Sequence, residues 1–350
     1  LGKMFIQKYL RKMAQAGCEV ALIETTSEGA VQYRHKFINY DMVVLTNLYP
    51  EHIESHGSFE NYKASKLGIF EYVSKSKRKD TRGKTCLVNK NNKYSEEFLG
   101  FNFEKKITFA VPSKAGGTGR SADVDYAPIN IGLDIAGLRF TVGEHRFAAR
   151  MYGEYNVANL TVAIAIARHF NLDWEKIKRI VAGFTNAPGR IEIIAEAEKY
   201  GFQVIVDYAF EPVAMAELYK VVKLLSPKRV IHVLGATGGG RDKERRFILG
   251  DFVGKKADIC IITNEDPYDD DPAEIIKDVA AAAARVGKIK DKDFFIEPDR
   301  RQAIKRAVDL AREGDLVLVT GKGSEQAIVA KGRLIPWDDR QAVRDSLALK

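Results

Sequence analysis

The length and composition of the chain place it among folded proteins of ordinary size. Its 350 residues are 45% hydrophobic and 29% charged, which excludes wholesale disorder, and the length predicts two domains. No stretch approaches the roughly 18 consecutive apolar residues of a membrane-spanning helix. The formal charge of +8 suits an anionic partner, but it does not distinguish nucleic acid from a nucleotide or a phosphorylated metabolite.

The cysteines and the start of the chain bear on its origin. Cys18, Cys86 and Cys260 are too few and too scattered for a disulfide framework or a zinc cluster, so we expect a reducing, cytoplasmic location. The chain begins at Leu1, and residues 3–16 read as the middle of an amphipathic helix without the pattern of a signal peptide. We therefore expect a fragment that lacks an N-terminal part.

The first half of the chain alternates apolar runs with helical periodicity, the pattern of βαβ units in a parallel sheet. Buried strands are expected at Glu19–Ile23 and Met42–Thr46, and helices at Asn61–Ser74, Asn156–Phe170 and Trp174–Phe184. Residues 84–150 differ, because they contain short β-rich runs, a Gly/Ser tract at Pro112–Ser121 and several candidate hairpins.

A turn-rich segment at Asn186–Gly189 separates this half from a second α/β pattern. Strands are expected near Val204–Asp207, Arg229–Leu234, Ile259–Thr263 and Leu316–Thr320, and helices near Pro212–Leu225, Pro272–Ala284 and Arg301–Ala311. Arg340–Lys350 reads as a short surface helix that closes a domain. We expect one domain over residues 1–187 and a second over residues 188–350.

Two glycine-rich segments partly match the phosphate-binding loop motif, but they lack its essential residues. Gly235–Asp242 follows a predicted strand, but Arg241 and Asp242 stand where the G-x-x-x-x-G-K-[ST] loop has its lysine and its Mg²⁺-binding hydroxyl. Gly116–Ser121 has no strand before it. The printed sequence therefore contains no intact loop of this type.

Residues that can bind a metal ion follow the predicted strands of the first half. The carboxyl ends of parallel strands face a binding crevice. Glu24 ends one strand and His52 follows the next, so the two could share a divalent cation such as Mg²⁺. A single histidine such as His52 is more often structural. Lys66 lies at helical spacing between Tyr62 and Phe70, and as a bare ammonium it would be repelled by a cation, so its plain interpretation is a solvated surface lysine.

Three motifs of this region resemble the central domain of the Mur ligases. They are Glu24-Thr-Thr-Ser27, Asn47-x₃-Glu51-His52-Ile-Glu54-x-His56-Gly57 and Tyr62-x₃-Lys66-x₃-Phe70. The resemblance implies that Lys66 is carbamylated and binds Mg²⁺ together with Glu24 and His52, since a carbamate is an anionic oxygen donor. It also implies that Ser27, Gln32 and Arg34 hold a UDP-sugar substrate, with Arg34 suited to a phosphate or carboxylate.

Motifs farther along the chain extend the resemblance toward an ATP site. Gly153-Glu-Tyr-Asn156-Val-Ala-Asn159 implies that Asn159 contacts adenine, although Asn156 on its own reads as an ordinary helix N-cap. Pro188-Gly189-Arg190 resembles the family's hinge into the C-terminal domain, whose arginine reaches the ATP phosphates. Asp207 resembles the aspartate that binds the ribose. Gly238–Arg246 resembles a loop of the form GG-x-RD-x-x-x-R, whose basic residues face the phosphates.

The expected amino-acid pocket departs from the family pattern. Family members that add meso-diaminopimelate carry Asp-Asn-Pro-Arg, whereas this chain has Glu265-Asp266-Pro267-Tyr268, and Tyr268 cannot pair with the distal carboxylate as arginine does. Gly321-Lys322-Gly323-Ser324-Glu325 matches Gly-Lys-Gly-His-Glu with Ser324 in place of histidine. The resemblance implies that the amino acid is contacted by Asp266, Tyr268, Gly321 and Glu325, the last through its ammonium group. Lysine or another diamine is weakly favoured over diaminopimelate.

The resemblance covers essentially the whole chain and implies an ATP- and Mg²⁺-dependent amide-bond ligase of peptidoglycan synthesis. Such an enzyme makes an acyl phosphate from UDP-N-acetylmuramoyl-L-Ala-D-Glu, which the amine of lysine or meso-diaminopimelate attacks. The implied catalytic residues are Lys66, His52 and Arg190. The expected fold is α/β, with a central ATP-binding domain whose parallel sheet is incomplete at its N-terminus and a Rossmann-like C-terminal domain. We expect small-molecule substrates, a monomer, and neither a nucleic-acid nor a membrane partner.

Departures from the family leave alternatives open. The family's UDP-binding domain and Gly-Lys-Thr phosphate loop do not occur in the printed sequence, so we expect the chain alone to be inactive. Phe210 replaces a usual histidine, which weakens any role assigned to position 210. One alternative is a related ligase such as folylpolyglutamate or cyanophycin synthetase, and another is a non-catalytic nucleotide- or amino-acid-binding protein. Nucleic-acid binding through net charge has no supporting motif. The joint presence of Glu24, His52 and Lys66 favours the ligase.

Overall fold

The structure, a computed structural model, describes residues 2–49, 56–79, 81, 83–112, 123–240 and 243–350. Contacts within the chain divide it into two compact units. The first comprises residues 1–132, 139–148 and 154–182, and the second residues 133–138, 149–153 and 183–350. The expected domain boundary at residues 187 and 188 stays a prediction.

The first unit contains a parallel three-stranded sheet in the order β1-β2-β3. Its strands are β1 (Met42–Leu45), β2 (Thr85–Asn89) and β3 (Lys105–Phe109), and its covering helices are α4 (Phe59–Ser74), α5 (Ser95–Leu99) and α6 (Tyr155–His169). Cys86 and Val88 face a core shared with α4 and α5, while Leu87 faces a second core shared with α6. This alternation follows from the two-residue period of a strand, which sends successive side chains to opposite faces.

The remaining elements of this half are two helices near its start and a separate small sheet. They are α1 (Lys3–Gln15), α2 (Ser27–Val31), β4 (Pro128–Asp134), β5 (Gly137–Val142), β6 (His145–Ala149) and α7 (Trp174–Ala182). The small sheet has the strand order β4-β5-β6. Trp174 of α7 stacks on His145 at 4.1 Å between ring centroids, so an aromatic contact holds α7 to β6.

The buried strand expected at Glu19–Ile23 is wrong. The segment has irregular backbone, with Val20 60% exposed and Leu22 88% exposed. A parallel strand exists only where a neighbour completes its hydrogen-bond ladder. In the described residues β1 pairs with β2 along one edge, and no described strand pairs with its other edge. The apolar run therefore has no ladder to join. The Gly/Ser tract lies largely outside the described residues.

The second unit is built on a six-stranded sheet in the order β11-β10-β9-β12-β8-β7. Its strands are β7 (Glu192–Ile193), β8 (Gln203–Asp207), β9 (Val230–Leu234), β10 (Ile259–Ile262), β11 (Phe294–Ile296) and β12 (Leu316–Thr320). β7 is antiparallel to β8, and the other pairings are parallel. A separate antiparallel hairpin consists of β13 (Ala327–Ala330) and β14 (Arg333–Pro336).

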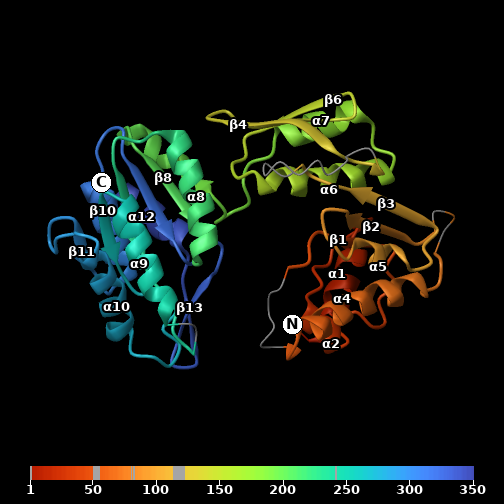
Figure 1. The fold of residues 1–350 in the computed structure, drawn as a ribbon, viewed down its shortest axis with the longest axis horizontal. Helices are drawn as coiled ribbons and strands as arrows, with labels where there is room; N and C mark the ends of the chain where they lie inside the picture. Colours follow the sequence, from red (N-terminus) through yellow and green to blue (C-terminus); the bar gives the residue numbers. More distant parts are fainter. Residues whose placement is uncertain (1, 50–55, 80, 82, 113–122, 241–242) are drawn as a thin grey trace. The chain divides into compact units, whose positions relative to one another are not determined.

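Helices cover both faces of this sheet and give three layers (Figure 1). One face carries α8 (Pro212–Leu225), α9 (Glu244–Lys256) and α10 (Pro272–Arg285), and the other carries the 3₁₀ helix η2 (Ala195–Tyr200), α11 (Arg300–Leu310) and α12 (Asp339–Ala348). Along β12, Leu316 and Leu318 join the first core, whereas Val317 and Val319 join the second. A strand buried on both faces reads as a continuous apolar run, which is why the sequence showed these strands clearly.

The α/β architecture and most expected elements are confirmed, with two corrections besides the strand at Glu19–Ile23. α12 is no surface helix, because Ala342, Val343 and Leu347 are buried in the core that it shares with α11. Asn156 is no N-cap, because α6 begins at Tyr155 and Glu154 occupies the N-cap position without a side-chain capping bond, leaving Asn156 buried inside the first turn. Among the described residues no helix is long and apolar enough to cross a membrane.

Candidate functional site

The candidate site lies at the carboxyl ends of strands in the second unit. Asp207 is the last residue of β8, Glu265 and Asp266 follow β10, and Gly321 follows β12. These strands are parallel, so their carboxyl ends meet at one edge of the sheet, the edge where α/β proteins bind ligands. The structure therefore brings residues from three sequence motifs to one place.

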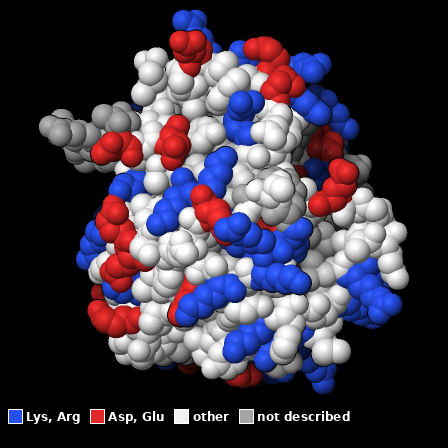
Figure 2. Space-filling model, turned by 90° about the vertical axis from the view of Figure 1, so that its right-hand side faces the viewer, with Lys and Arg blue, Asp and Glu red and all other residues white. Residues whose placement is uncertain are grey.

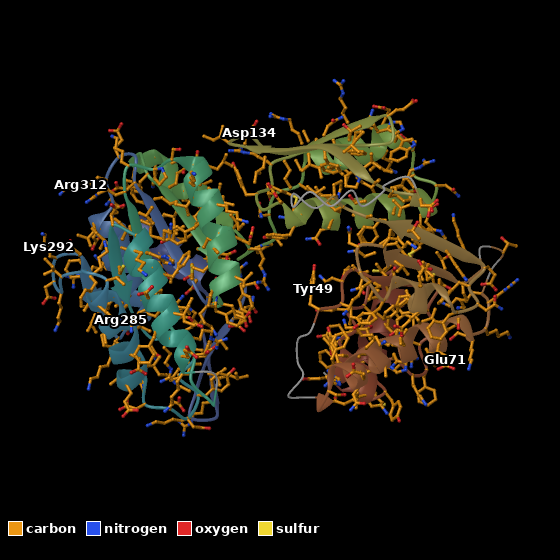
Figure 3. The ribbon with its side chains drawn as sticks, in the orientation of Figure 1. Tyr49, Glu71, Asp134, Arg285, Lys292 and Arg312 are labelled. Atoms are coloured by element: carbon orange, nitrogen blue, oxygen red, sulfur yellow. The ribbon has the colours of Figure 1, made fainter. Side chains whose placement is uncertain are left out.

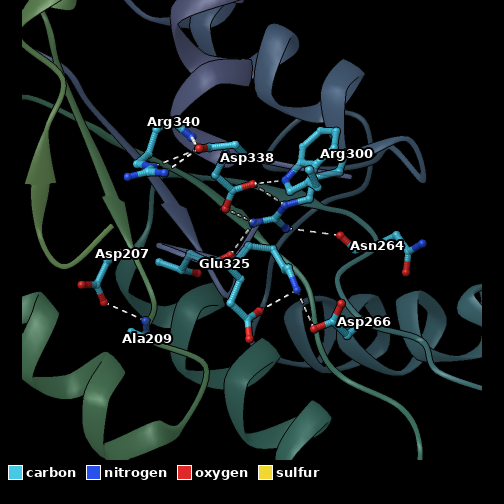
Figure 4. Close-up of polar contacts among 12 residues, drawn as sticks. Asp207, Ala209, Asn264, Asp266, Arg300, Glu325, Asp338 and Arg340 are labelled. Carbon is cyan, nitrogen blue, oxygen red and sulfur yellow. Dashed lines mark hydrogen bonds and ion pairs between the residues drawn. The ribbon is translucent and has the colours of Figure 1, made fainter. Parts of the chain in front are cut away.

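A continuous series of side-chain contacts joins the predicted residues Arg190, Glu325 and Asp266. The guanidinium of Arg190 lies over the Tyr208 ring at 4.1 Å, a cation–π contact. The Tyr208 hydroxyl donates a hydrogen bond of 3.2 Å to Glu325 Oε1. Lys322 Nζ then lies 2.6 Å from both Glu325 Oε2 and Asp266 Oδ2 (Figure 4). Arg190 and the expected amino-acid pocket thus form one polar network.

Lys322 is the buried centre of this network. Its side chain is 1% exposed, so its ammonium has lost water and needs counter-charges, which Asp266 and Glu325 supply. Asp266 also accepts a hydrogen bond of 2.7 Å from Val329 N. Glu325 retains a 39% exposed side chain. Burial, with the nearby Glu325 carboxylate, raises the pKa of Tyr208 to about 12, so Tyr208 stays a neutral donor.

Glycines allow the hinge and the loops to approach closely. Gly189 has φ +67°, and a Cβ there would lie 2.2 Å from the backbone of Gly323 and Ser324. Gly321 has φ +106°, and a Cβ there would lie 2.1 Å from Glu265 Oε2. Both the left-handed backbone and the space exclude a side chain at these positions. The predicted residue Gly321 is therefore required by packing inside the protein.

The glycine-rich loop after β9 packs against the loop that follows β10. A Cβ on Gly238 would lie 2.2 Å from Pro267 O, and one on Gly239 would lie 2.7 Å from Tyr268 Cγ. Gly238 N also donates a hydrogen bond of 2.8 Å to Asp266 O. This packing accounts for Gly238 and Gly239 without a bound phosphate. Arg241 and Asp242 lie outside the described residues.

Tyr268 connects the loop after β10 to the β13–β14 hairpin. Tyr268 N donates to Val329 O at 3.0 Å, and Tyr268 O accepts from Lys331 N at 2.6 Å. Its φ of +52° is uncommon for a residue with a large side chain, and such backbone is often found at binding sites. The side chain is half-buried against Gly239. Tyr268, the residue that the sequence indicates for substrate specificity, is therefore fixed by its backbone bonds to the hairpin and by the packing of its side chain against Gly239.

Asp207 is braced by backbone groups. Its Oδ1 accepts a hydrogen bond of 2.7 Å from Ala209 N (Figure 4). Its Oδ2 accepts one of 2.7 Å from Ile191 N. Burial raises the pKa of this carboxyl group. Each carboxylate oxygen can accept a further hydrogen bond, so the arrangement leaves capacity for hydroxyl donors such as those of a ribose.

Sequence reasoning missed Arg300 and Asp339, which form a deeply buried ion pair beside this network. Arg300 Nε and Nη2 each lie 2.7 Å from an oxygen of Asp339, with side-chain exposures of 1% and 0% (Figure 4). A signal was present, because Arg300 falls on the same helical stripe as Ala303, Ile304 and Ala307, which are all buried. An arginine on an apolar stripe indicates a buried partner.

In the first unit, the residues expected to hold the UDP-sugar gather around α2. Ser27 is buried, and its Oγ lies 3.0 Å from His56 Nε2. Gln32 Oε1 accepts a hydrogen bond of 2.9 Å from Arg34 Nε. On α6, Asn159 Nδ2 donates to Asn156 Oδ1 at 3.0 Å. The roles assigned to these residues stay predictions.

The expected Mg²⁺ site of Glu24, His52 and Lys66 stays a prediction. Glu24 is exposed on irregular backbone, while Lys66 is half-buried on α4 with its Nζ 5.2 Å from the Tyr62 ring centroid. His52 lies outside the described residues. Within the described part of the chain, no group of three His, Cys, Asp or Glu residues could hold a metal ion. The carbamate on Lys66 stays a prediction, and no reaction step below depends on it.

The fold and the site define an α/β protein with a candidate ligand-binding edge in its second unit, and comparisons with known proteins give the family. Residues 3–167 match the Mur ligase middle domain, and residues 189–323 match the Mur ligase, glutamate ligase domain. The chain belongs to the Mur ligase family.

Ligases of known name are similar in sequence to nearly the whole chain. It is 33% identical to a UDP-N-acetylmuramyl-tripeptide synthetase of Roseiflexus sp., covering 98% of this chain and 67% of the relative. It is 32% identical to the UDP-N-acetylmuramoyl-L-alanyl-D-glutamate–2,6-diaminopimelate ligase of Aquifex aeolicus, covering 97% of this chain and 65% of the relative. The chain thus spans about two thirds of the length of such relatives.

Solved structures show the same fold. A UDP-N-acetylmuramoyl-L-alanyl-D-glutamate–2,6-diaminopimelate ligase superposes with a TM-score of 0.64 at 24% identity, covering 100% of this chain and 68% of that one. The UDP-N-acetylmuramate-alanine ligase of Thermotoga maritima gives a TM-score of 0.63 at 15% identity, covering 93% of this chain and 61% of that one. At these identities the likeness concerns the fold alone.

Proposed function

We propose that the complete protein is an ATP-dependent ligase that adds the third amino acid to UDP-N-acetylmuramoyl-L-alanyl-D-glutamate in peptidoglycan synthesis. The observation that carries the proposal is the match of 97–98% of the chain to ligases so named, at 32–33% identity. The network from Arg190 through Glu325 to Asp266 supports it, because it joins two motifs that the reaction must bring together. The proposal concerns the whole protein, because about a third of the length of such a relative lies outside the match to this chain.

The proposed reaction has two steps. The substrate carboxylate attacks the γ-phosphorus of ATP and gives an acyl phosphate and ADP; the amine then attacks the carbonyl carbon, expels phosphate and loses a proton. Asn159 is proposed to contact adenine, Asp207 the ribose and Arg190 the phosphates. The cofactors are ATP and Mg²⁺, which would neutralise phosphate charge. The protein is proposed to act in the cytoplasm as a monomer on small molecules.

The first test is a phosphate-release assay on the complete gene product. ATP and UDP-N-acetylmuramoyl-L-Ala-D-Glu are supplied with lysine and with meso-diaminopimelate in parallel reactions. We expect phosphate release that requires all three substrates and that one amine supports. A folded protein that binds ATP but releases no phosphate with either amine would instead support the non-catalytic binding protein.

The surface charges fit small-molecule substrates better than nucleic acid. On the face drawn in Figure 2, many basic groups have acidic neighbours. Exposed ion pairs of the first unit include Lys75–Glu71 and Lys79–Asp41. In the second unit, Arg285, Lys292 and Arg312 point outward at separate places (Figure 3). Neutralised and scattered cations give weak phosphate-backbone binding, which needs a continuous basic footprint.

The choice of amino acid is proposed to depend on Tyr268, with lysine or another diamine preferred. Replacing Tyr268 with arginine supplies the guanidinium that a distal carboxylate can bind through two hydrogen bonds. We expect Tyr268→Arg to raise kcat/KM for meso-diaminopimelate relative to lysine by about tenfold. Tyr268→Phe is the matched control and should leave the ratio unchanged. An unchanged ratio in Tyr268→Arg would show that specificity lies elsewhere.

A further inference from the structure

The buried guanidinium of Arg300 contacts both loops of the proposed amino-acid site. Arg300 Nη2 donates to Thr320 O at 2.7 Å, and Arg300 Nη1 donates to Asn264 O at 3.2 Å. Thr320 directly precedes Gly321-Lys322, and Asn264 directly precedes Glu265-Asp266. One side chain therefore holds the backbone at the start of each loop (Figure 4).

These two loops follow strands that are not neighbours. β9 lies between β10 and β12, so no ladder of backbone hydrogen bonds joins the ends of β10 and β12 directly. Across this gap the loops meet through the ion pair between Lys322 and Asp266. Arg300 spans the same gap, and its planar guanidinium presents donors in a rigid fork. The fork fixes the separation of the two carbonyls, and hence the position of Asp266 relative to Lys322.

The orientation of Arg300 is fixed in turn by α12. Asp339, the first residue of α12, binds the guanidinium through both carboxylate oxygens, and Trp337 Nε1 donates to Asp339 Oδ1 at 2.7 Å. On the other side, His232 Nε2 lies 2.9 Å from Thr320 Oγ1. Burial lowers the pKa of His232 to about 3, so this histidine is neutral and adds no competing charge.

We propose that Arg300 is a positioning residue for the amino-acid substrate. It holds the loop of Asp266 and the loop of Glu325 at the separation that the amino acid requires, and it does so without contacting the substrate. The proposal rests on the proposed function. It extends the site to the ion pair between Arg300 and Asp339, which joins α11 to α12.

The test is made in the complete gene product. It compares the kinetics of Arg300→Lys with those of a variant that weakens the same hydrophobic core at another residue. Lysine keeps the positive charge beside Asp339, but one ammonium cannot hold both carbonyls. We expect the KM for the amino acid to rise by about tenfold in Arg300→Lys, because small displacements of substrate contacts have large kinetic effects. The KM values for ATP and the nucleotide-peptide should change by less than about twofold. Val343→Ala, in the core of α12, is the control for stability.

Backbone amide hydrogen exchange is a second test of whether Arg300 holds the two loops, and it does not depend on enzyme turnover. Residues 264–268 and 320–325 should exchange faster in Arg300→Lys, but not in Val343→Ala. Unchanged exchange in Arg300→Lys, or an equal rise of the amino-acid KM in Val343→Ala, would overturn the proposal. If the unmodified protein releases no phosphate, the proposed function fails, and faster exchange confined to Arg300→Lys would still support the holding of the two loops.

Discussion

Replacing Lys322 with methionine is expected to lower the free energy of unfolding of the second unit by about 3–5 kcal/mol. Lys322 is 1% exposed, and its ammonium is 2.6 Å from both Asp266 and Glu325. Methionine fills a similar volume, but it leaves the Asp266 carboxylate, which is 8% exposed, without its counter-charge. The large cost comes from that orphaned buried charge, since an intact buried pair contributes little against its own desolvation.

Urea denaturation followed by Trp337 fluorescence measures this loss. The chain has two tryptophans, so a Trp174→Phe background leaves Trp337, within the second unit, as the reporter. Lys305→Met is the matched control, because the Lys305–Asp309 pair is exposed and should contribute less than about 1 kcal/mol. Adding Asp266→Asn to Lys322→Met should recover part of the loss. Equal stability of Lys322→Met and Lys305→Met would contradict the role of Lys322 as the buried centre.

The sequence predicted the second unit better than the first for a physical reason. Strands such as Leu316–Thr320 are buried on both faces, so their continuous apolar runs reflect the final structure directly. Glu19–Ile23 shows the same kind of run, but in the described residues it has no strand to pair with and stays exposed. Composition indicates a tendency to form a strand, whereas the hydrogen-bond ladder that realises it depends on distant residues.

The candidate site was also predicted only in part: its individual residues were located, but its ion pairs were not. Local motifs located Asp266, Gly321 and Glu325, because each follows a strand in a short recognisable segment. The pairing of Lys322 with Asp266, 56 residues away in sequence, could not be read from either motif. The apolar stripe around Arg300 indicates a buried partner, but it does not say that this partner is Asp339, at the start of another helix. Which charges are buried together is decided by the tertiary packing.

Glu265→Gln is expected to remove a pH dependence from the stability of the second unit. Glu265 is 3% exposed, and burial raises its pKa from 4.5 to about 7, with Asp266 and Asp339 adding to the shift and Arg300 and Lys322 opposing it. Between these two pKa values the folded protein holds a proton that the unfolded chain has released. The free energy of unfolding therefore falls as pH rises from 4.5 through 7, and the contribution is complete only below 4.5.

Glutamine keeps the shape of the protonated side chain and does not ionise. At about 1.36 kcal/mol for each pKa unit, the advantage of Glu265→Gln over the unmodified protein should grow by about 2–3 kcal/mol between pH 5 and pH 8. Urea denaturation in the Trp174→Phe background at several pH values measures this difference. Glu198→Gln, which alters an exposed carboxyl group, should follow the unmodified protein throughout. Parallel profiles for Glu265→Gln and the unmodified protein would show that Arg300 and Lys322 compensate the buried carboxylate fully, and would contradict the raised pKa of Glu265.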